Sequence, residues 1–345
     1  MASSADSLLD QQQYFGQQQS FRTIYRQQLQ QLQLLMKKLL PLHNPKGGKD
    51  GAVKGVVVFL LDVEGTTTPL PFVTKVLYPE SEVKLAAYCQ QNYKDLMKNE
   101  IIAASKACAE VAAAINSSTV EEAKVLTAFV AHLKDLISKN SKAPYLKSIQ
   151  GKIWKLGYET GAIEGHLFTD VANTMRHIAV EKLAEVHIFS SGSIQAQKLL
   201  FRYSSSGDLT PYIHGYHDTV TAGPKFQAKS YQKIRAKIAQ QRAVEEANVH
   251  IVFLTDILAE IRAAHAAGGI VPVLSLRPLN HRLAKDDIEA TGIPRPLLAL
   301  CSFEQMFPQG RKADAILGTL YDDVQRYKSS SSVSAATPQK LKSFL

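Results

Sequence analysis

The sequence has few cysteines and no long apolar run, and both absences restrict where the protein works. Cys89, Cys108 and Cys301 are widely spaced and form no pairing or metal-binding pattern, so we expect free thiols in a reducing compartment. No run approaches the ~18 apolar residues that a membrane-spanning helix needs. Asp6 and Asp10 precede the first basic residue and no apolar signal core follows, which argues against secretion and against a transit peptide. We therefore expect a cytoplasmic protein without a membrane partner, with the nucleus as an alternative location.

The net charge of +9 is concentrated near the two ends of the chain. Residues 1–55 hold seven Lys/Arg against three Asp/Glu, and residues 309–345 hold six against three. Residues 56–308 hold 27 against 25, so this central part is close to neutral. It also has no stripe of basic residues interleaved with aromatic ones, and we therefore do not expect nucleic acid as a partner.

The two ends of the chain differ in composition from its centre. Residues 1–35 are rich in glutamine, and a Pro/Gly/Lys-rich linker follows them. Four leucines between residues 29 and 39 would share one face of a helix, which leaves a partner-binding helix as an alternative. We favour a flexible Gln-rich extension and linker over residues 1–55. The Ser-rich C-terminal tail, residues 309–345, has a composition typical of disorder.

Four apolar, β-branched runs predict strands that are buried on both faces: residues 56–61, 186–189, 249–254 and 270–274. Helical patterns follow or separate these runs, over residues 194–202, 230–240 and 257–267. Alternation of this kind predicts an α/β fold, with a Rossmann-like parallel sheet and helices on both of its faces. Ligands of such sheets bind at the carboxyl ends of the strands.

The stretch of residues 73–165 interrupts this alternation. It is rich in Ala, Lys and Glu and has a helical pattern, and Thr119 with Glu122 predicts a capping box at the start of one helix. We expect an all-helical cap, inserted after the first strand, that covers the crevice of the sheet. A second domain of unrelated purpose is the alternative. The core would then comprise residues 56–72 and 166–308.

The octapeptide DVEGTTTP, which begins at Asp62, follows the first predicted strand directly. A carboxylate at this place needs a partner, because an unpaired charge is poorly solvated there. Phosphoryl transfer needs an anionic nucleophile, a cation and hydrogen-bond donors around the phosphate oxygens. Asp62 could be that nucleophile, and Glu64 could protonate the leaving oxygen and later activate water. A strand-end aspartate that only caps a turn is the structural alternative.

Two further segments could bind phosphate. Ser190 and Ser191 follow the second predicted strand and open a helix, where hydroxyls, N–H groups and the helix dipole favour an anion. An ordinary helix cap is the alternative reading of these serines. Lys225, in the loop TAGPKFQAK, could offset the phosphate charge, with Lys229 as a competing candidate.

Asp256 lies at the end of the third predicted strand, in the segment FLTDILAE. Together with Asp62 it would form the oxygen-rich site that Mg²⁺ prefers, with positions left for water and phosphate. Glu260 follows one helical turn later. We interpret Glu260 as an ion-pair partner rather than a direct metal ligand.

These residues occur in an order that resembles the haloacid-dehalogenase-like hydrolases: Asp nucleophile, Ser, Lys and a final acidic residue. Glu64 stands where most of that superfamily has Asp. This glutamate makes the chain similar to one branch, the enolase-phosphatases of methionine salvage, also called acireductone synthases. Further similar segments, in the family's order over roughly residues 56–305, are TPLPFVTKVLYP, IQGKIW, SSGSIQAQKLLF, GDL with GYHDT, SYQKI, FLTDILAE and LRPLN.

The resemblance implies a function and a role for each matching residue. The family converts 2,3-diketo-5-methylthiopentyl-1-phosphate to an acireductone and phosphate with Mg²⁺, by enolisation and then dephosphorylation through an aspartyl-phosphate. We expect a monomer that binds this small phosphorylated substrate. The implied roles are Asp62 as nucleophile and metal ligand, Glu64 as acid/base with its carbonyl on the metal, Ser190 and Ser191 on the substrate, Lys225 on the phosphate, and Asp256 on the metal.

The expected cap departs from the family pattern. The chain reads Tyr-Pro-Glu at residues 78–80 where the family often has Phe-Pro-Tyr, and Lys-Ile-Trp-Lys at residues 152–155 where it commonly has His-Met-Trp-Arg. A phosphatase of the same superfamily that acts on another small phosphate ester is therefore an alternative. An inactive member that works as a binding protein is a second alternative, although Asp62, Glu64 and Lys225 are all retained.

Overall fold

The computed structural model describes residues 29–46, 55–117, 119–139, 141–277 and 297–307. The expected C-terminal tail and the first 28 residues of the Gln-rich segment lie outside the described residues. Within the described residues no helix is long and apolar enough to cross a lipid bilayer.

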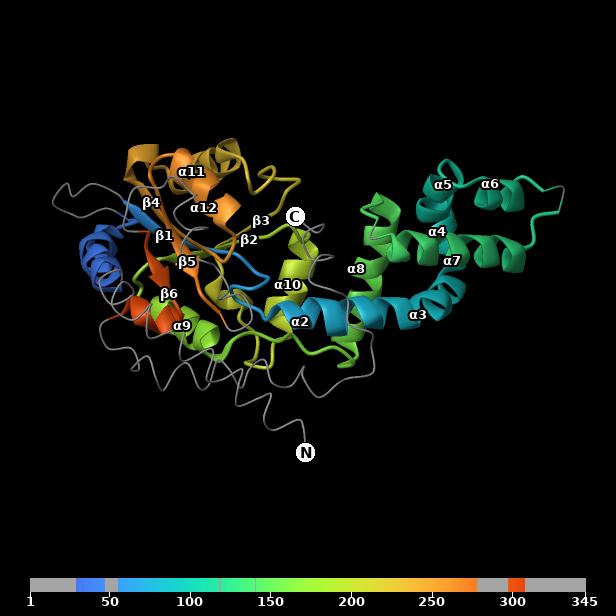
Figure 1. Ribbon diagram of the computed structural model, residues 1–345, viewed down its shortest axis with the longest axis horizontal. Coiled ribbons are helices and arrows are strands. Elements are labelled where there is room, and N and C mark those ends of the chain that lie inside the picture. The colour runs from blue at the N-terminus through green and yellow to red at the C-terminus, as the bar shows by residue number, and fades with distance from the viewer. Residues whose placement is uncertain (1–28, 47–54, 118, 140, 278–296, 308–345) are drawn as a thin grey trace, which may run out of the picture. The chain divides into compact units, whose positions relative to one another are not determined.

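A single parallel sheet forms the centre of the fold, and its strands lie in the order β3-β2-β1-β4-β5-β6 (Figure 1). The strands are β1 (Val56–Leu61), β2 (Glu185–Phe189), β3 (Gly215–His217), β4 (Val249–Thr255), β5 (Ile270–Ser275) and β6 (Ala299–Leu300). All six side chains of β1 are buried, as its continuous apolar run predicted. The chain builds the sheet outward from β1 through β2 and β3 and then returns to β4. Its direction therefore reverses between β1 and β4, where open sheets of this kind bind ligands.

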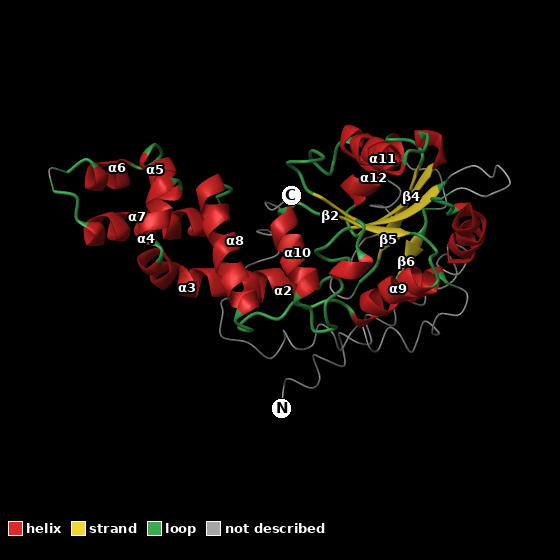
Figure 2. Ribbon diagram, turned by 180° about the vertical axis from the view of Figure 1, so that it is seen from behind, coloured by secondary structure: helices red, strands yellow, loops and turns green. Residues whose placement is uncertain are grey.

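Helices cover both faces of this sheet (Figure 2), so the predicted α/β fold class is confirmed. On one face Tyr231 and Ile234 of a long helix pack against Val58 and Leu60 of β1. On the other face the ring of Phe307 lies against Phe59, with ring centroids 6.3 Å apart. The helices of this part are α9 (Thr169–Val180), α10 (Ile194–Arg202), α11 (Ala228–Arg242) and α12 (Leu258–Ala266), with short η3 (Thr210–Tyr212), η4 (Glu246–Asn248) and η5 (Phe303–Met306).

A buried polar chain that the sequence did not reveal connects β2 and β3. His187 Nδ1 lies 3.1 Å from His217 Nε2, and His187 Nε2 lies 3.1 Å from a carboxylate oxygen of Glu185. Arg242 pairs with the other oxygen of Glu185 at 2.6 Å. Burial, with His187 beside it, lowers the pKa of His217 to about 3, so this imidazole stays neutral. Gly215 is required at the start of β3, because a Cβ there would collide with the His187 ring.

Part of the Gln-rich segment is ordered and packs on the sheet-containing part. Residues 29–39 form a helix, which η1 (Leu40–Leu42) continues. Leu32 and Met36 are almost completely buried, and Gln33 Nε2 donates to the Gln305 carbonyl at 3.1 Å. These residues therefore differ from the flexible extension that we favoured. The helical periodicity was visible in the sequence, but the surface that buries it comes from elsewhere in the chain.

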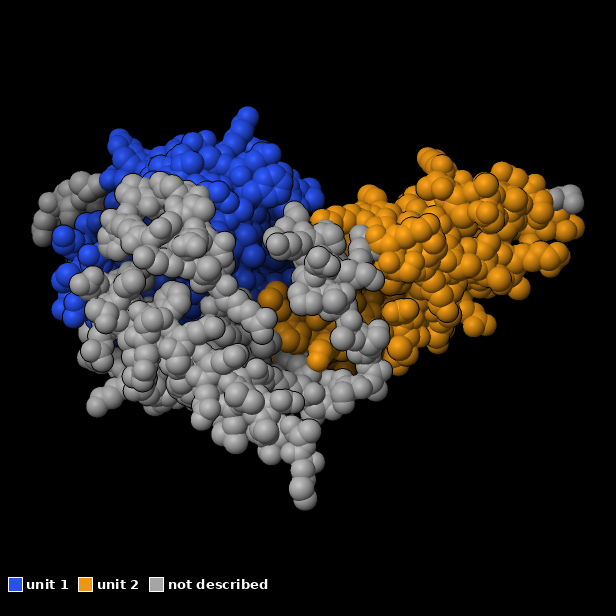
Figure 3. All heavy atoms as spheres, in the orientation of Figure 1, with its two compact units in different colours: residues 1–69, 167–197, 208–326 blue, residues 70–166, 198–207, 327–345 orange. Residues whose placement is uncertain are grey.

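The chain divides into two compact units (Figure 3). The first comprises the described residues within 29–69, 167–197 and 208–307, and the second comprises the described residues within 70–166 and 198–207. The described elements between β1 and α9 are helical: α2 (Leu70–Phe72), η2 (Val73–Leu77), α3 (Tyr78–Gln91), α4 (Tyr93–Lys98), α5 (Glu100–Ser105), α6 (Ala109–Ile115), α7 (Glu122–Ser138) and α8 (Pro144–Glu159). They enclose an apolar core of their own, which includes Leu85, Phe129 and Ile149.

The predicted capping box of α7 is wrong. The helix begins two residues later than Thr119 would require, and its N-cap is Glu121, which makes no side-chain capping bond. The Thr119 carbonyl instead accepts a hydrogen bond from Ser117 Oγ at 2.7 Å. Thr119 therefore belongs to the turn that precedes the helix and not to its N-terminus.

Candidate active site

The two aspartates expected to bind metal follow the two central strands. Asp62 comes directly after β1, and its N–H donates to the Leu254 carbonyl of β4 at 2.9 Å, which continues the pairing of the strands. Asp256 comes directly after β4. Both residues are buried, with 5% and 7% of their surface exposed. Because β1 and β4 are neighbours at the point where the strand order reverses, the sheet brings these carboxylates to one edge.

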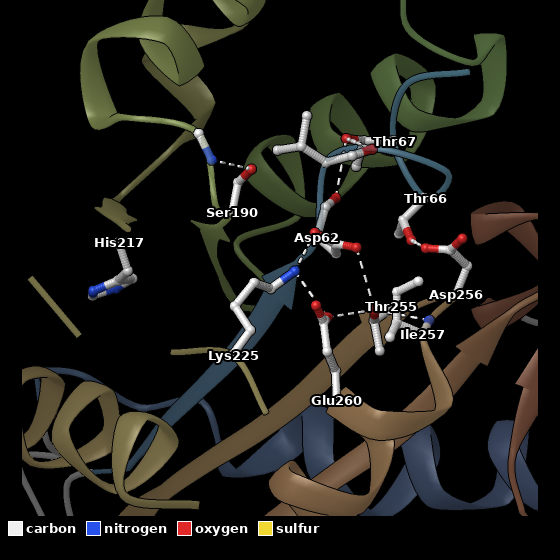
Figure 4. A network of polar contacts seen from close by, with 12 residues as sticks. Asp62, Thr66, Thr67, Ser190, His217, Lys225, Thr255, Asp256, Ile257 and Glu260 are labelled. Atoms are coloured by element: carbon white, nitrogen blue, oxygen red, sulfur yellow. Dashed lines mark hydrogen bonds and ion pairs between the residues drawn. The ribbon is translucent and has the colours of Figure 1, made fainter. Parts of the chain in front are cut away.

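A tight turn follows Asp62 and presses against Asp256. The Val63 carbonyl accepts hydrogen bonds from the N–H groups of Thr66, Thr67 and Thr68 at 2.9–3.2 Å. Thr66 Oγ1 donates to Asp256 Oδ1 at 3.3 Å (Figure 4). Gly65 has φ +76° in this turn, and a Cβ there would overlap the Asp256 carboxylate. The glycine therefore allows both the left-handed backbone and the close approach.

We expect Gly65→Ala to displace the Asp256 carboxylate and to lower the catalytic activity predicted for this site at least about tenfold, because the loss of a contact that supports a metal ligand typically has an effect of this size. The left-handed backbone adds a strain of about 1 kcal/mol. Gly268→Ala is the matched control, since Gly268 has φ +72° and open space where its Cβ would lie. The control should share the loss of stability and keep full activity. Equal activity in the two variants would show that the contact between Gly65 and Asp256 is irrelevant.

Lys225 reaches the same edge from the loop before α11. Its amine forms ion pairs with Asp62 and with Glu260, the latter at 2.8 Å, and it lies 5.6 Å from the ring centre of Phe189 (Figure 4). Burial alone would lower the pKa of Lys225, but the two carboxylates outweigh burial and raise it, so the amine stays charged. Lys229, the competing candidate, is exposed.

Glu260 and Thr255 complete a buried network around Asp62. Glu260 forms the ion pair that the sequence favoured for it. Thr255 Oγ1 lies 2.7 Å from a Glu260 oxygen and 3.2 Å from Asp62 Oδ2, and it accepts a hydrogen bond from the Ile257 N–H. Burial raises the pKa of Glu260 to about 7, although Lys225 opposes this effect. Sequence reasoning missed Thr255, whose only signal was a hydroxyl next to Asp256 at a strand end.

The two expected substrate serines differ in their environment. Ser190 is buried after β2, its N–H donates to the His217 carbonyl, and its Oγ accepts from the Gly192 N–H at 3.1 Å. Ser191 is exposed. Gln197 Nε2 donates to the carbonyls of Gly192 and His217, both at 2.8 Å, and so fixes the serine loop to β3. Because β2 is the neighbour of β1, this loop lies at the same edge of the sheet as Asp62.

Glu64 lies within the turn, where its backbone forms a bridge with Thr68, and its side chain is exposed. The fold thus brings together Asp62, Lys225 and Asp256, with Ser190 on a neighbouring strand end.

The donor set fits a magnesium ion. Within the described residues no group of three or more His, Cys, Asp or Glu side chains is arranged to hold a metal. Mg²⁺ does not need such a group, because it usually keeps several waters and takes one or two protein carboxylates together with substrate phosphate. Asp62 and Asp256 are two buried carboxylates, and the absence of a side chain at Gly65 keeps the Asp256 carboxylate in place.

Comparison with known proteins shows the family of the chain. The chain is 40% identical over 233 residues to "Enolase-phosphatase E1" of Yarrowia lipolytica, a match that covers 67% of this chain and 93% of the relative. It is 41% identical over 233 residues to the protein of that name from Synechococcus elongatus, over 65% of this chain and 90% of the relative. The chain belongs to the enolase-phosphatase E1 family. The resemblance drawn from the sequence motifs is thereby confirmed.

The fold of this enolase-phosphatase family member also has a solved counterpart. The crystal structure of the UTR4 protein from Saccharomyces cerevisiae aligns with a TM-score of 0.53 and 30% identity, over 72% of this chain and 98% of that one. A scan against protein-family models found no match. The relatives are covered almost completely, whereas about a third of this chain lies outside each enolase-phosphatase match.

Proposed function

We propose that the protein is a Mg²⁺-dependent enolase-phosphatase of methionine salvage, which converts 2,3-diketo-5-methylthiopentyl-1-phosphate to an acireductone and phosphate. The observation that carries this proposal is the buried cluster of Asp62, Lys225 and Asp256 at the carboxyl edge of the sheet, in a chain of the enolase-phosphatase E1 family. An enzyme with this activity is a phosphoric monoester hydrolase.

Asp62 is the proposed nucleophile. One oxygen of its carboxylate is held by Lys225 and the other lies 3.2 Å from Thr255 Oγ1, so the group is oriented before substrate arrives. It attacks phosphorus and forms an aspartyl-phosphate, while the bond to the enol oxygen of the substrate breaks.

In this mechanism Glu64 transfers protons and Lys225 compensates negative charge. Glu64 protonates the leaving enol oxygen and then takes a proton from the water that hydrolyses the aspartyl-phosphate. Its side chain is exposed and lies in the turn directly after Asp62, where solvent and substrate can reach it. Lys225 offsets negative charge on the transferring phosphoryl group, and Ser190 with Ser191 donates to its oxygens.

Mg²⁺ would be held by Asp62 and Asp256 with the Glu64 carbonyl, and when bound it reduces the repulsion between the carboxylate and the phosphate. Thr66 keeps Asp256 oriented toward this position through its hydroxyl.

A phosphatase for another small phosphate ester is the second candidate, and an observation in the helical unit favours it. Lys152 belongs to the segment that departs from the family pattern, and its amine pairs with Glu100, which is 5% exposed and also accepts from Ser148 Oγ. This segment is therefore held by a buried ion pair of its own. A different cap would select a different substrate. A binding protein without activity is disfavoured, since the charged cluster at Asp62 is complete.

One assay tests the proposal. Purified protein with Mg²⁺ receives the diketo phosphate, and enol ultraviolet absorbance is followed together with released phosphate. Transient absorbance followed by stoichiometric phosphate, both stopped by a chelator and restored by Mg²⁺, is the expected result. Phosphate release without an enol signal, or activity only on other esters, would favour the second candidate. Folded protein that is inactive toward a panel of phosphate esters would refute both.

A further inference from the structure

Arg277 is a completely buried arginine that none of the proposed steps uses. It follows β5 by two residues and has no exposed surface. A buried guanidinium is costly unless its charge and its donors are matched. Its Nη1 pairs with Asp170 Oδ2 at 2.8 Å and donates to the Cys301 carbonyl at 3.0 Å. Its Nε donates to the Thr66 carbonyl at 2.9 Å.

The surroundings hold Arg277 in one geometry. The rings of Phe168 and Phe303 each lie 4.6 Å from its Cζ, which is close enough for a cation–π contact with both. Asp170 is itself fixed, because its Oδ2 also accepts from Ser302 Oγ at 2.9 Å and from the Phe303 N–H at 2.7 Å. The planar guanidinium thus fits a site that a flexible ammonium group cannot reproduce.

The bond from Arg277 to Thr66 connects this buried group with the active site. Thr66 belongs to the turn after Asp62, and its own hydroxyl donates to Asp256. Gly65, the preceding residue, touches the Asp256 carboxylate so closely that a Cβ would not fit. A shift of the Thr66 backbone would therefore displace the turn that follows Asp62, and it would also change the orientation of the Asp256 carboxylate.

We propose that Arg277 is a positioning residue for the divalent-cation site, which acts by fixing the Thr66 carbonyl so that Asp62 and Asp256 keep the spacing the ion requires. This inference rests on the proposed function only in that Asp62 and Asp256 bind Mg²⁺. It does not depend on which phosphate ester is the substrate. Mutation of a residue that supports the ligands of a metal commonly weakens metal binding 10- to 100-fold.

The direct test is calorimetric titration of Mg²⁺ into the metal-free full-length protein. Arg277→Lys should raise the Kd for Mg²⁺ at least about tenfold, because an ammonium group cannot reach Asp170 and Thr66 in the same directions. Arg235→Lys is the matched control. Arg235 also donates to several backbone carbonyls of the same unit, including those of Val249 and Glu246. The control should lose stability and keep the wild-type Kd.

A second variant keeps the test decisive if Arg277→Lys does not fold. Thr66→Val removes only the hydroxyl that faces Asp256 and leaves the Arg277 contacts in place, so it should fold and also raise the Kd for Mg²⁺. Wild-type Kd values in Thr66→Val and in folded Arg277→Lys would overturn the inference, even if Arg277→Lys melts at a lower temperature. Wild-type protein that binds no Mg²⁺ would overturn it as well. Wild-type protein that binds Mg²⁺ but leaves the diketo phosphate unchanged would refute only the proposed function.

Discussion

Asp62→Asn should lower phosphate release by at least about 10³-fold, because an amide cannot attack phosphorus to form an acyl phosphate. The fold should persist. Asparagine keeps the shape of the side chain, and Lys225 retains its ion pair with Glu260. Phosphate release and circular dichroism on the same preparation measure both expectations.

The nucleophile itself can be identified in the same experiment. Acid-quenched turnover of the wild-type protein should yield a phosphorylated peptide that contains Asp62, which mass spectrometry detects and which the variant should lack. Asp135→Asn, a change at an exposed residue paired with Lys139, is the control and should keep wild-type rates. Substantial activity in Asp62→Asn would mean that another group attacks the phosphorus.

Lys225→Met should reduce both activity and stability. Methionine keeps most of the length of the side chain but removes the charge, so the carboxylates of Asp62 and Glu260 lose their buried cation and the Phe189 ring loses its cation–π contact. Removal of one partner from a buried ion pair typically costs about 3 kcal/mol or more. Activity should fall about 10²-fold or more, since a charge that faces the phosphoryl group is lost. Chemical denaturation and phosphate release measure the two effects.

The stability loss of Lys225→Met should depend on pH. Burial already raises the pKa of Glu260 from 4.5 to about 7 in the wild type, and removal of the amine raises it further. A raised carboxyl pKa favours the folded state at low pH and destabilises it as the pH rises through the folded-state value. The variant should therefore be closer to wild type at pH 5 than at pH 8. Lys229→Met, at an exposed lysine, should change neither property, and an equal effect of the two substitutions would exclude the buried ion pair as the cause.

The strands that sequence reasoning found and missed differ in length and composition. β1 is a continuous apolar run, and β4 and β5 are mostly apolar, as burial on both faces of a parallel sheet requires. β3 is three residues long and contains Gly215 and His217, and β6 has only two residues. Neither has a local signal, because each forms only by pairing with a neighbour that is already in place.

The site residues follow the same division. Asp62 and Asp256 were predictable because each ends a recognisable strand and parallel strands share one carboxyl edge. The residues themselves left Lys225 and Lys229 both open, and only the family resemblance favoured Lys225. The structure separates them, because Lys225 is buried in the loop before α11 and Lys229 is exposed in the first turn of that helix. The roles of Thr255 and Arg277 were not predictable either, because each depends on a contact with a residue far away in the sequence, Asp62 and Asp170 respectively.

The sequence by itself determined the α/β class, the order of the chemical groups and the family, because apolar periodicity and motif order are local properties of the chain. Only the tertiary structure decided which charges are paired. Lys225 lies 163 residues from Asp62 and Arg277 lies 211 residues from Thr66, and each contact exists only because the sheet and its covering helices bring those segments together. Burial and pairing energies depend on this long-range packing, and no local pattern encodes them.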